Sequence, residues 1–186
     1  MILFVSGIDT GIGKTVATGL MARWYAGRGR NVITQKLVQT GCEESSEDVQ
    51  VHRKLMGTGL LPEDHGGLTC PYVFKFPGSP HLAAALEGRR VDVGRLESAT
   101  RELAQKYDVV LVEGVGGMCV PLTEETTVLD YLERQGWPTV LVTAPRLGSI
   151  NHTLLSLEAL HARRLPLAAV IYNLYYAARP EIVADS

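Results

Sequence analysis

The stretch Gly7-Ile-Asp-Thr-Gly-Ile-Gly-Lys-Thr15 decides the fold that we predict for this chain. It follows the apolar run Ile2–Ser6, which has the length of a buried strand, and it leads into the helical pattern of Thr15–Ala26. A glycine-rich loop between a strand and a helix exposes backbone N–H groups that bind phosphate oxygens. We therefore predict a phosphate-binding loop, in which the Lys14 ammonium reaches the β and γ phosphates and the Thr15 hydroxyl binds magnesium.

The loop departs from the strict phosphate-binding pattern at one position. The pattern GxxxxGK[ST] has glycine where this chain has Ile8, although the Gly-Lys-Thr core and the strand–loop–helix context are present. A plain turn followed by a helix start is the alternative interpretation, and the preceding strand argues against it. The residues expected to bind the nucleotide phosphates are Asp9, Thr10, Gly11, Ile12, Gly13, Lys14 and Thr15.

Short apolar runs and helical patterns alternate along the rest of the chain. Continuous apolar runs are typical of strands covered on both faces, as in a parallel sheet. The further predicted strands are Asn31–Gln35, Val109–Glu113, Thr139–Thr143 and Ala168–Tyr172. The further predicted helices are Val93–Lys106, Thr127–Gln135 and Ile150–Ala162. We predict an α/β fold, a doubly wound and mainly parallel sheet with helices on both faces, which binds ligands at the carboxyl ends of its strands.

Size and composition favour one compact domain over residues 1–186. Hydrophobic residues make up 46% of the chain, enough for a core without metal or disulfide staples. The net charge of −2 argues against an extended nucleic-acid surface, and the first apolar run is too short to span a membrane. The widely spaced Cys42, Cys70 and Cys119 predict no zinc site and no disulfide, but small buried or half-buried side chains in a reducing, cytoplasmic compartment.

Two charged residues lie at the ends of predicted strands. Glu113 closes a buried run and precedes a glycine-rich loop, 114–117, so it could hold magnesium directly or through water. Lys36 follows the second strand and would project over the same edge, where it could neutralise a carboxylate, carbamate or phosphoryl oxygen. The alternatives are an ordinary charged strand end for Glu113 and a solvated surface position for Lys36.

Asp48, the histidines and one later segment carry less specific signals. Asp48 starts the next helix, where N-capping and metal ligation are equally compatible with its position. The segment Leu147–His152 turns a strand end into a helix whose exposed amides can bind an anion. The five histidines show no metal-ligand spacing, and surface positions are expected for His52, His65 and His161.

Several motifs, taken together and in register, resemble the dethiobiotin synthetase family. They are Gly-x-Asp-Thr-x-x-Gly-Lys-Thr at 7–15, Lys36, Ser79-Pro-His81, Glu87-Gly88, Val112-Glu-Gly-x-Gly-Gly117, Pro121-Leu122 and Leu147-Gly-x-Ile-Asn-His152. The resemblance spans residues 1 to about 173 and keeps the family's order and approximate spacing. Any one motif is weak by itself, whereas the set is specific.

The resemblance implies a reaction. The diamine 7,8-diaminopelargonate takes up CO2 to form a carbamate, ATP phosphorylates the carbamate, and the second amine closes the cyclic urea of dethiobiotin, leaving ADP and phosphate. The family implies that Lys14, Lys36 and Thr10 are catalytic and that Thr15, Asp48 and Glu113 surround Mg²⁺. It also implies a homodimer, with the diamine near Lys36, Thr40 and Gly116 and its carboxylate held by Ser149, Ile150 and Asn151 of a second subunit.

The chain departs from the family pattern around the expected base site. Asn173 matches a base-contacting asparagine, but Leu174 replaces the acid that commonly follows it. The chain stops at Ser186, and its C-terminal segment is short relative to the family, where a later loop borders the adenine. Smaller departures are Leu37 in place of proline and Met118-Cys119 in place of a more usual aromatic pair.

Two other classes of protein share the predicted sheet and loop. A partition or septum-site ATPase switch carries a second lysine in the loop, at the position where this chain has Asp9. A cobyrinate-type amidoligase domain has a similar loop, but its glutaminase half has no counterpart in this chain. Hydrolysis of ATP without the diamine would point to the switch class.

Overall fold

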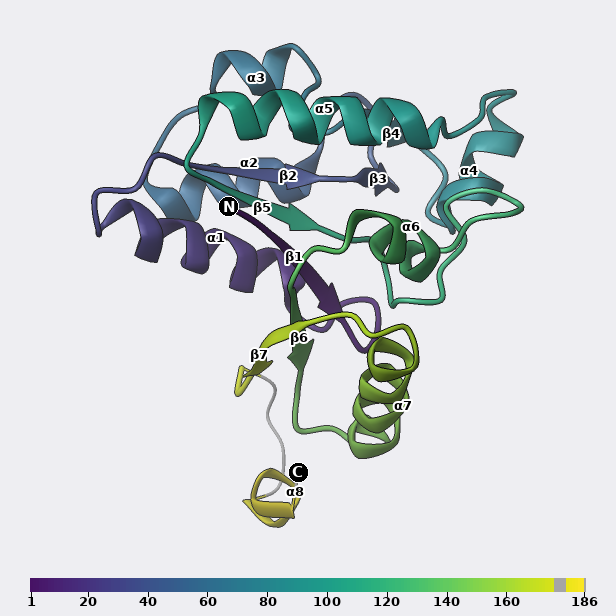
Figure 1. Cartoon of the computed structure of the whole chain (residues 1–186). Coiled ribbons are helices and arrows are strands. Elements are labelled where there is room, and N and C mark those ends of the chain that lie inside the picture. The colour runs from purple at the N-terminus through teal and green to yellow at the C-terminus, as the bar shows by residue number, and fades with distance from the viewer. Residues whose placement is uncertain (176–179, 186) are drawn as a thin grey trace.

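The computed structural model of the chain describes residues 1–175 and 180–185. Within these residues the main sheet has five strands, all parallel, in the spatial order β2-β5-β1-β6-β7 (Figure 1). The strands are β1 (Ile2–Gly7), β2 (Val32–Lys36), β5 (Val109–Glu113), β6 (Thr139–Thr143) and β7 (Leu167–Tyr172). Each matches a predicted apolar run closely, and the predicted α/β fold class is confirmed.

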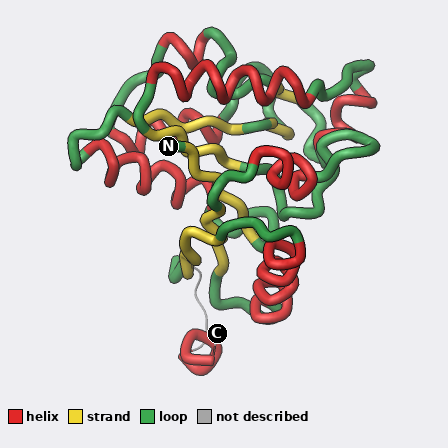
Figure 2. The backbone as a smooth tube through the Cα atoms, viewed as in Figure 1, coloured by secondary structure: helices red, strands yellow, loops and turns green. Residues whose placement is uncertain are grey.

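Helices follow most of the strands and cover the sheet from two sides (Figure 2). They are α1 (Lys14–Ala26), α2 (Glu47–Met56), α3 (Pro62–His65), α4 (Pro80–Leu86), α5 (Val93–Lys106), α6 (Val128–Gln135), α7 (Ser149–Ala162) and α8 (Pro180–Asp185). No helix in the described part of the chain is long and apolar enough to cross a membrane.

The side-chain alternation along β5 divides the core into two layers. Val110 and Val112 belong to the larger hydrophobic cluster, to which α5 and α6 also contribute. Val109 and Leu111 belong to the smaller cluster, together with Ala22 of α1. Because side chains alternate between the faces of a strand, the last residue of β5 points to the same side as Val109 and Leu111, toward α1 and α2.

A second, smaller sheet was not predicted. Its strands β3 (Val38–Thr40) and β4 (Tyr72–Phe74) pair in parallel, with Val38 opposite Tyr72. Strands of three residues are too short to show a periodic pattern, so no apolar run or alternation indicates them. The segment 57–80, for which the sequence predicts no element, contains α3 and β4.

The helix starts follow ordinary capping chemistry. The Thr127 hydroxyl accepts a hydrogen bond from the Asp130 N–H at 3.1 Å, and the Asp130 carboxylate accepts one from the Thr127 N–H at 2.8 Å, so α6 begins with a capping box. At α2 the N-cap is Ser46, whose hydroxyl accepts from the N–H of Val49. The capping interpretation of Asp48 is therefore wrong, because a better placed hydroxyl two residues earlier takes that role.

Candidate active site

The loop between β1 and α1 folds back over its own backbone. The Lys14 ammonium donates to the carbonyl oxygen of Asp9 at 2.9 Å, and the Asp9 carboxylate accepts from the N–H of Thr10 at 2.7 Å. That carboxylate also pairs with Arg146, which follows β6. No side chain caps the start of α1, so its first backbone N–H groups face the loop, as a phosphate-binding helix requires.

Asn173 and Gly13 lie in contact at the start of α1. The Asn173 side-chain N–H donates to the carbonyl oxygen of Ile12 at 3.0 Å. Gly13 has a φ of 103°, and a Cβ there would lie 2.3 Å from the Asn173 amide nitrogen. Both the backbone conformation and the close approach therefore require glycine at this position. The expected base-contacting residue is thus beside the loop, with its amide nitrogen bonded to loop backbone.

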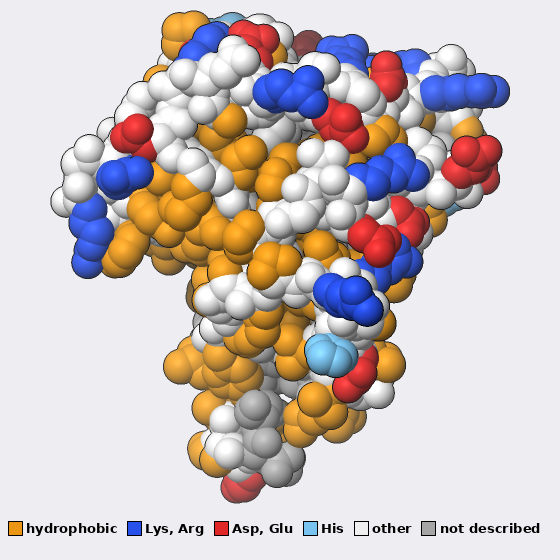
Figure 3. Space-filling view, in the orientation of Figure 1, with side chains coloured by type: hydrophobic (Ala, Val, Ile, Leu, Met, Phe, Trp, Pro, Cys, Tyr) orange, Lys and Arg blue, Asp and Glu red, His pale blue; other side chains and the backbone are white. Residues whose placement is uncertain are grey.

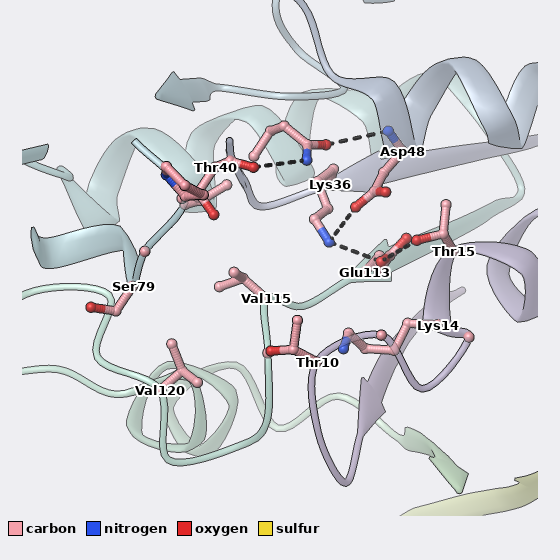
Figure 4. Close-up of a pocket in the computed structure, with 17 residues that line it drawn as sticks. Thr10, Lys14, Thr15, Lys36, Thr40, Asp48, Ser79, Glu113, Val115 and Val120 are labelled. Atoms are coloured by element: carbon pink, nitrogen blue, oxygen red, sulfur yellow. Dashed lines mark hydrogen bonds and ion pairs between the residues drawn. The ribbon is translucent and has the colours of Figure 1, made fainter. Parts of the chain in front are cut away.

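Lys36 and Glu113 are directly paired across neighbouring strands. They are register partners of β2 and β5, and their charged groups approach to 2.8 Å (Figure 4). The Lys36 ammonium also donates to the Asp48 carboxylate at 2.7 Å and to the carbonyl oxygen of Gly114 at 2.9 Å. Lys36 is 5% exposed and Glu113 1% exposed, so the surface interpretation of Lys36 is wrong.

Burial and charge act against each other in this cluster. Burial favours the neutral acid, but the Lys36 ammonium and the hydrogen bond from His52 lower the pKa of Glu113 to about 2. Burial likewise disfavours the Lys36 cation, but Glu113 and then Asp48 raise the pKa of Lys36 above its ordinary value. Lys14 lacks such close partners, so burial and then repulsion from Lys36 lower its pKa to about 8. Bound polyphosphate, as a nearby anion, would raise the pKa of Lys14 again.

Three oxygen-bearing side chains predicted for Mg²⁺ meet at this cluster. The Thr15 hydroxyl donates to Glu113 Oε1 at 3.0 Å, and the Lys36 ammonium joins that same oxygen to Asp48. The described residues contain no group of three or more His, Cys, Asp or Glu side chains placed to hold a metal. Magnesium needs fewer protein ligands, since it usually keeps waters and takes one or two carboxylates beside the phosphates. The oxygen atoms of Thr15, Asp48 and Glu113 lie together beside the Lys36 ammonium, and they are hard donors of the kind that Mg²⁺ binds.

A cavity of about 580 Å³ lies over the cluster. It contains both lysines, and Figure 4 places Thr10 with Lys14 on one side and Thr40 with Ser79 on another. The predicted site residues among its lining are Thr10, Gly11, Gly13, Lys14, Thr15, Lys36, Thr40, Asp48, Glu113 and Gly116. The structure therefore brings the predicted phosphate, metal and diamine residues around one opening.

The predicted substrate-carboxylate residues are not in the lining of this cavity. Ser149, Ile150 and Asn151 form the start of α7, which follows β6 at the other end of the sheet. Gly148, in the left-handed conformation, precedes the helix, and no side chain caps it. The Ser149 N–H donates to the carbonyl oxygen of Arg146 at 3.0 Å, which leaves the N–H groups of Ile150 and Asn151 available for an anion. In this single chain the helix start does not line the cavity over Lys36 and Glu113.

Two side chains differ from the expectations drawn from sequence. His52 was expected on the surface, but it is fully buried and its Nε2 lies 2.8 Å from Glu113 Oε2. The available signal was its spacing, four residues after Asp48, which places both side chains on one face of a helix. Cys119 is exposed, whereas Cys42 is buried and Cys70 half-buried as expected.

The parallel sheet, the loop at 7–15 and the buried strand-end carboxylate define the chain as a P-loop nucleotide-binding protein. Solved structures support the fold. A ParA family ATPase from Chlorobium tepidum superposes with a TM-score of 0.58 over 99% of this chain and 78% of its own, at 14% identity. The kinase domain of the Escherichia coli tyrosine kinase ETK gives 0.53 over 96% and 69%, at 18% identity. At such identities the likeness concerns the fold alone.

Sequence relatives define the family. A family model described as an AAA domain matches residues 2–183. An ATP-dependent dethiobiotin synthetase of Chlorobaculum tepidum is 56% identical over 185 residues, covering 100% of this chain and 77% of that protein. Proteins of the same description from Pasteurella multocida and Haemophilus influenzae are 55% and 52% identical over 94% of this chain, and 82% and 91% of their own length. The chain belongs to the ATP-dependent dethiobiotin synthetase family, which confirms the resemblance found in the motifs.

Proposed function

We propose that this chain catalyses the MgATP-dependent closure of 7,8-diaminopelargonate and CO2 to dethiobiotin. Family membership across the whole chain supports the reaction, and the buried Lys36–Glu113 pair under the P-loop is the observation that supports the chemistry. The relatives do not favour the switch or amidoligase alternatives. Three unpaired cysteines are compatible with a cytosolic location.

The reaction needs two new bonds at one carbon atom. One amine of the diamine attacks CO2 and loses a proton to give the carbamate. A carbamate oxygen then takes the γ-phosphoryl group from ATP, and ADP leaves. The second amine attacks the same carbon, phosphate leaves with the carbamate oxygen, and the cyclic urea forms. Phosphoryl transfer of this kind depends mainly on positioning and on neutralising charge.

The two lysines have different tasks in this scheme. Lys14, held over the loop, would approach the β and γ phosphates, while Lys36 would neutralise the carbamate or the transferring group. All three N–H bonds of the Lys36 ammonium are engaged by Glu113, Asp48 and Gly114. Contact with a substrate oxygen therefore requires that one of these partners be exchanged.

The remaining assignments follow from position around the cavity. We assign Mg²⁺ to the oxygens of Thr15, Asp48 and Glu113, where it would neutralise phosphate charge. The diamine would lie between the P-loop and the segment 77–79, with Thr10, Thr40 and Gly116 as neighbours. The phosphates would lie along the backbone of residues 9–15.

A homodimer would supply the carboxylate site that the single chain does not bring to this cavity. The start of α7 has the N–H groups of Ile150 and Asn151 available, and its neighbouring apolar side chains are exposed: Ile150 is 44%, Leu154 56% and Leu155 61% exposed. Figure 3 shows hydrophobic side chains gathered on this lower part of the molecule. A fully active monomer, found by light scattering at assay concentration, would contradict this assignment.

One assay tests the function. Purified protein is mixed with the diamine, bicarbonate and MgATP, and dethiobiotin is measured by mass spectrometry together with ADP. Release of ADP should require the diamine, CO2 and magnesium together. Full-rate ATP hydrolysis without the diamine, and no dethiobiotin, would instead place the chain among the nucleotide-driven switches.

A further inference from the structure

His52 is a buried polar residue behind the cavity that the reaction scheme does not use. It lies one helical turn after Asp48 in α2 and is 0% exposed. Its Nε2 is 2.8 Å from Glu113 Oε2, and its Nδ1 has no hydrogen-bond partner among the described residues. His52 does not line the cavity, whereas Asp48 and Glu113 do. It can therefore act on a ligand only through another side chain.

The hydrogen bond has a definite direction. The Glu113 carboxylate is ionised and can only accept, so the imidazole Nε2 must carry the proton and donate it. A proton on the buried Nδ1 would lack an acceptor among the described residues. The Nε2–H of His52 is therefore directed at Glu113.

This bond divides the two oxygens of Glu113 between two tasks. Oε2 accepts from His52 on the side of α2, and Oε1 accepts from Thr15 and Lys36 on the side of the cavity. A carboxylate held by one oxygen cannot rotate about its last side-chain bond without losing that hydrogen bond. The oxygen that faces the cavity thus has a fixed direction before any ligand arrives.

The packing of α2 brings His52 to this position. A Cβ at Gly19 of α1 would lie 2.7 Å from the Leu55 side chain and 3.3 Å from the His52 Cα, so the two helices cross closely at this glycine. Next to His52, the buried Arg53 binds Asp64 through two hydrogen bonds of 2.8 Å and also reaches Thr34 of β2. Helix α2 is therefore fixed near His52 by its close packing on α1 and by the bonds of Arg53 to β2 and Asp64.

We propose that His52 is a positioning residue for the metal site, which holds Glu113 so that Oε1 faces the cation and Thr15. The proposal rests on the function proposed above and adds to it the residue that sets the metal affinity. Hydrogen bonds to a ligating carboxylate commonly matter in this way, and their loss costs about 10–100-fold in metal affinity or activity. A core histidine that only fills space would not affect the metal.

The test compares two substitutions with similar volume and different chemistry. His52→Gln keeps an N–H donor near the Nε2 position, whereas His52→Leu removes it. Mn²⁺ binding is titrated by electron paramagnetic resonance, with a non-hydrolysable ATP analogue and no diamine. We expect the Mn²⁺ dissociation constant to rise about 10-fold or more in His52→Leu and to stay within about threefold in His52→Gln. The Mg²⁺ concentration for half-maximal dethiobiotin formation should shift in parallel.

Val49→Ala is the matched control, since Val49 is buried in the same helix and its side chain has no polar atom that could bond to Glu113. It should lower the melting temperature and leave the Mn²⁺ constant unchanged. An unchanged Mn²⁺ constant in a folded His52→Leu, or an equal loss in His52→Gln and His52→Leu, overturns the positioning role. Because the titration needs no diamine, it decides this role even if the unaltered protein forms no dethiobiotin, an outcome that would overturn the proposed function separately.

Discussion

Two parts of the molecule use their interior differently. We call β2, β5 and β1 with α1 and α2 the charged half, and β6 and β7 with α7 the apolar edge. In the charged half, Lys36, Glu113 and His52 are buried in contact with one another. At the apolar edge the first four residues of β7 are exposed, as are Leu154 and Leu155 of α7. The charged half is thus preorganised within one chain, whereas the apolar edge leaves hydrophobic surface uncovered.

The largest expected effect tests whether the charged half is held by buried ion pairs. Arg53→Leu should lower the free energy of unfolding by about 3–5 kcal/mol, because Asp64 would remain buried without its cation. Arg53 is 2% and Asp64 6% exposed in the side chain, and three donors join Arg53 to Asp64 and Thr34. Urea unfolding at pH 7, followed by circular dichroism, measures the change.

Arg163→Leu is the control from the apolar edge. Arg163 pairs with Asp130 and Glu133, but its side chain is 32% exposed, and such pairs contribute about 0–1 kcal/mol. If Arg53→Leu and Arg163→Leu lowered the free energy of unfolding equally, ion pairs would stabilise the two parts to the same extent, and the proposed difference between them would be wrong.

The next effect concerns chemistry within the charged half. Lys36→Ala should lower turnover by about 10²-fold or more, because a preorganised cation is lost where charge develops in the transition state. Lys75→Ala serves as a control, since Lys75 is exposed and its ammonium pairs with the exposed Glu43. Steady-state ADP release at saturating MgATP and diamine gives the turnover of each variant relative to that of the unaltered protein. A folded Lys36→Ala enzyme with near-normal turnover would remove Lys36 from the catalytic residues.

Nucleobase selectivity should be smaller, because it depends on the apolar edge. Asn173 follows β7, its N–H donates to the carbonyl of Ile12, and its oxygen accepts from the N–H of Tyr175. Both polar atoms thus have partners before a base binds. One good hydrogen-bonded pair is worth roughly 1–3 kcal/mol, so kcat/KM for ATP should exceed that for CTP or GTP by less than about 100-fold. A much stronger preference would mean that other residues read the base.

The smallest effect is a pH dependence beside the apolar edge. Hydrogen bonds from Thr127, aided by Arg163, lower the pKa of Asp130 to about 2 from its ordinary 3.8. A lowered carboxyl pKa stabilises the fold above the ordinary value, and this contribution is lost as pH falls toward 2. Asp130→Asn should therefore cost about 1 kcal/mol at pH 7, with the difference shrinking between about pH 4 and pH 2. Urea unfolding at several pH values is the measurement; a constant difference would contradict it.

The sequence predicted the long strands and helices better than the positions of single side chains. Val109–Glu113 and Val93–Lys106 match β5 and α5 residue for residue, because long apolar or amphipathic runs leave little choice of structure. The capping role of Asp48 was wrong, because Ser46 competes for the same backbone groups. His52 was misplaced because its burial depends on how closely α2 crosses α1 at Gly19, whereas its spacing from Asp48 indicates only a shared helix face.

The parallel register of β2 and β5 has a consequence for how this chain can vary. Lys36 faces Glu113 because both side chains occupy the same side of neighbouring strands, with Val32 opposite Val109 at the other end of the pairing. Deleting one residue between Val109 and Glu113 would turn the acid to the opposite face, since the side-chain period of a strand is two. Natural insertions and deletions in this chain should therefore collect in connections such as 57–80 and spare the interior of β5, whatever length the loops acquire.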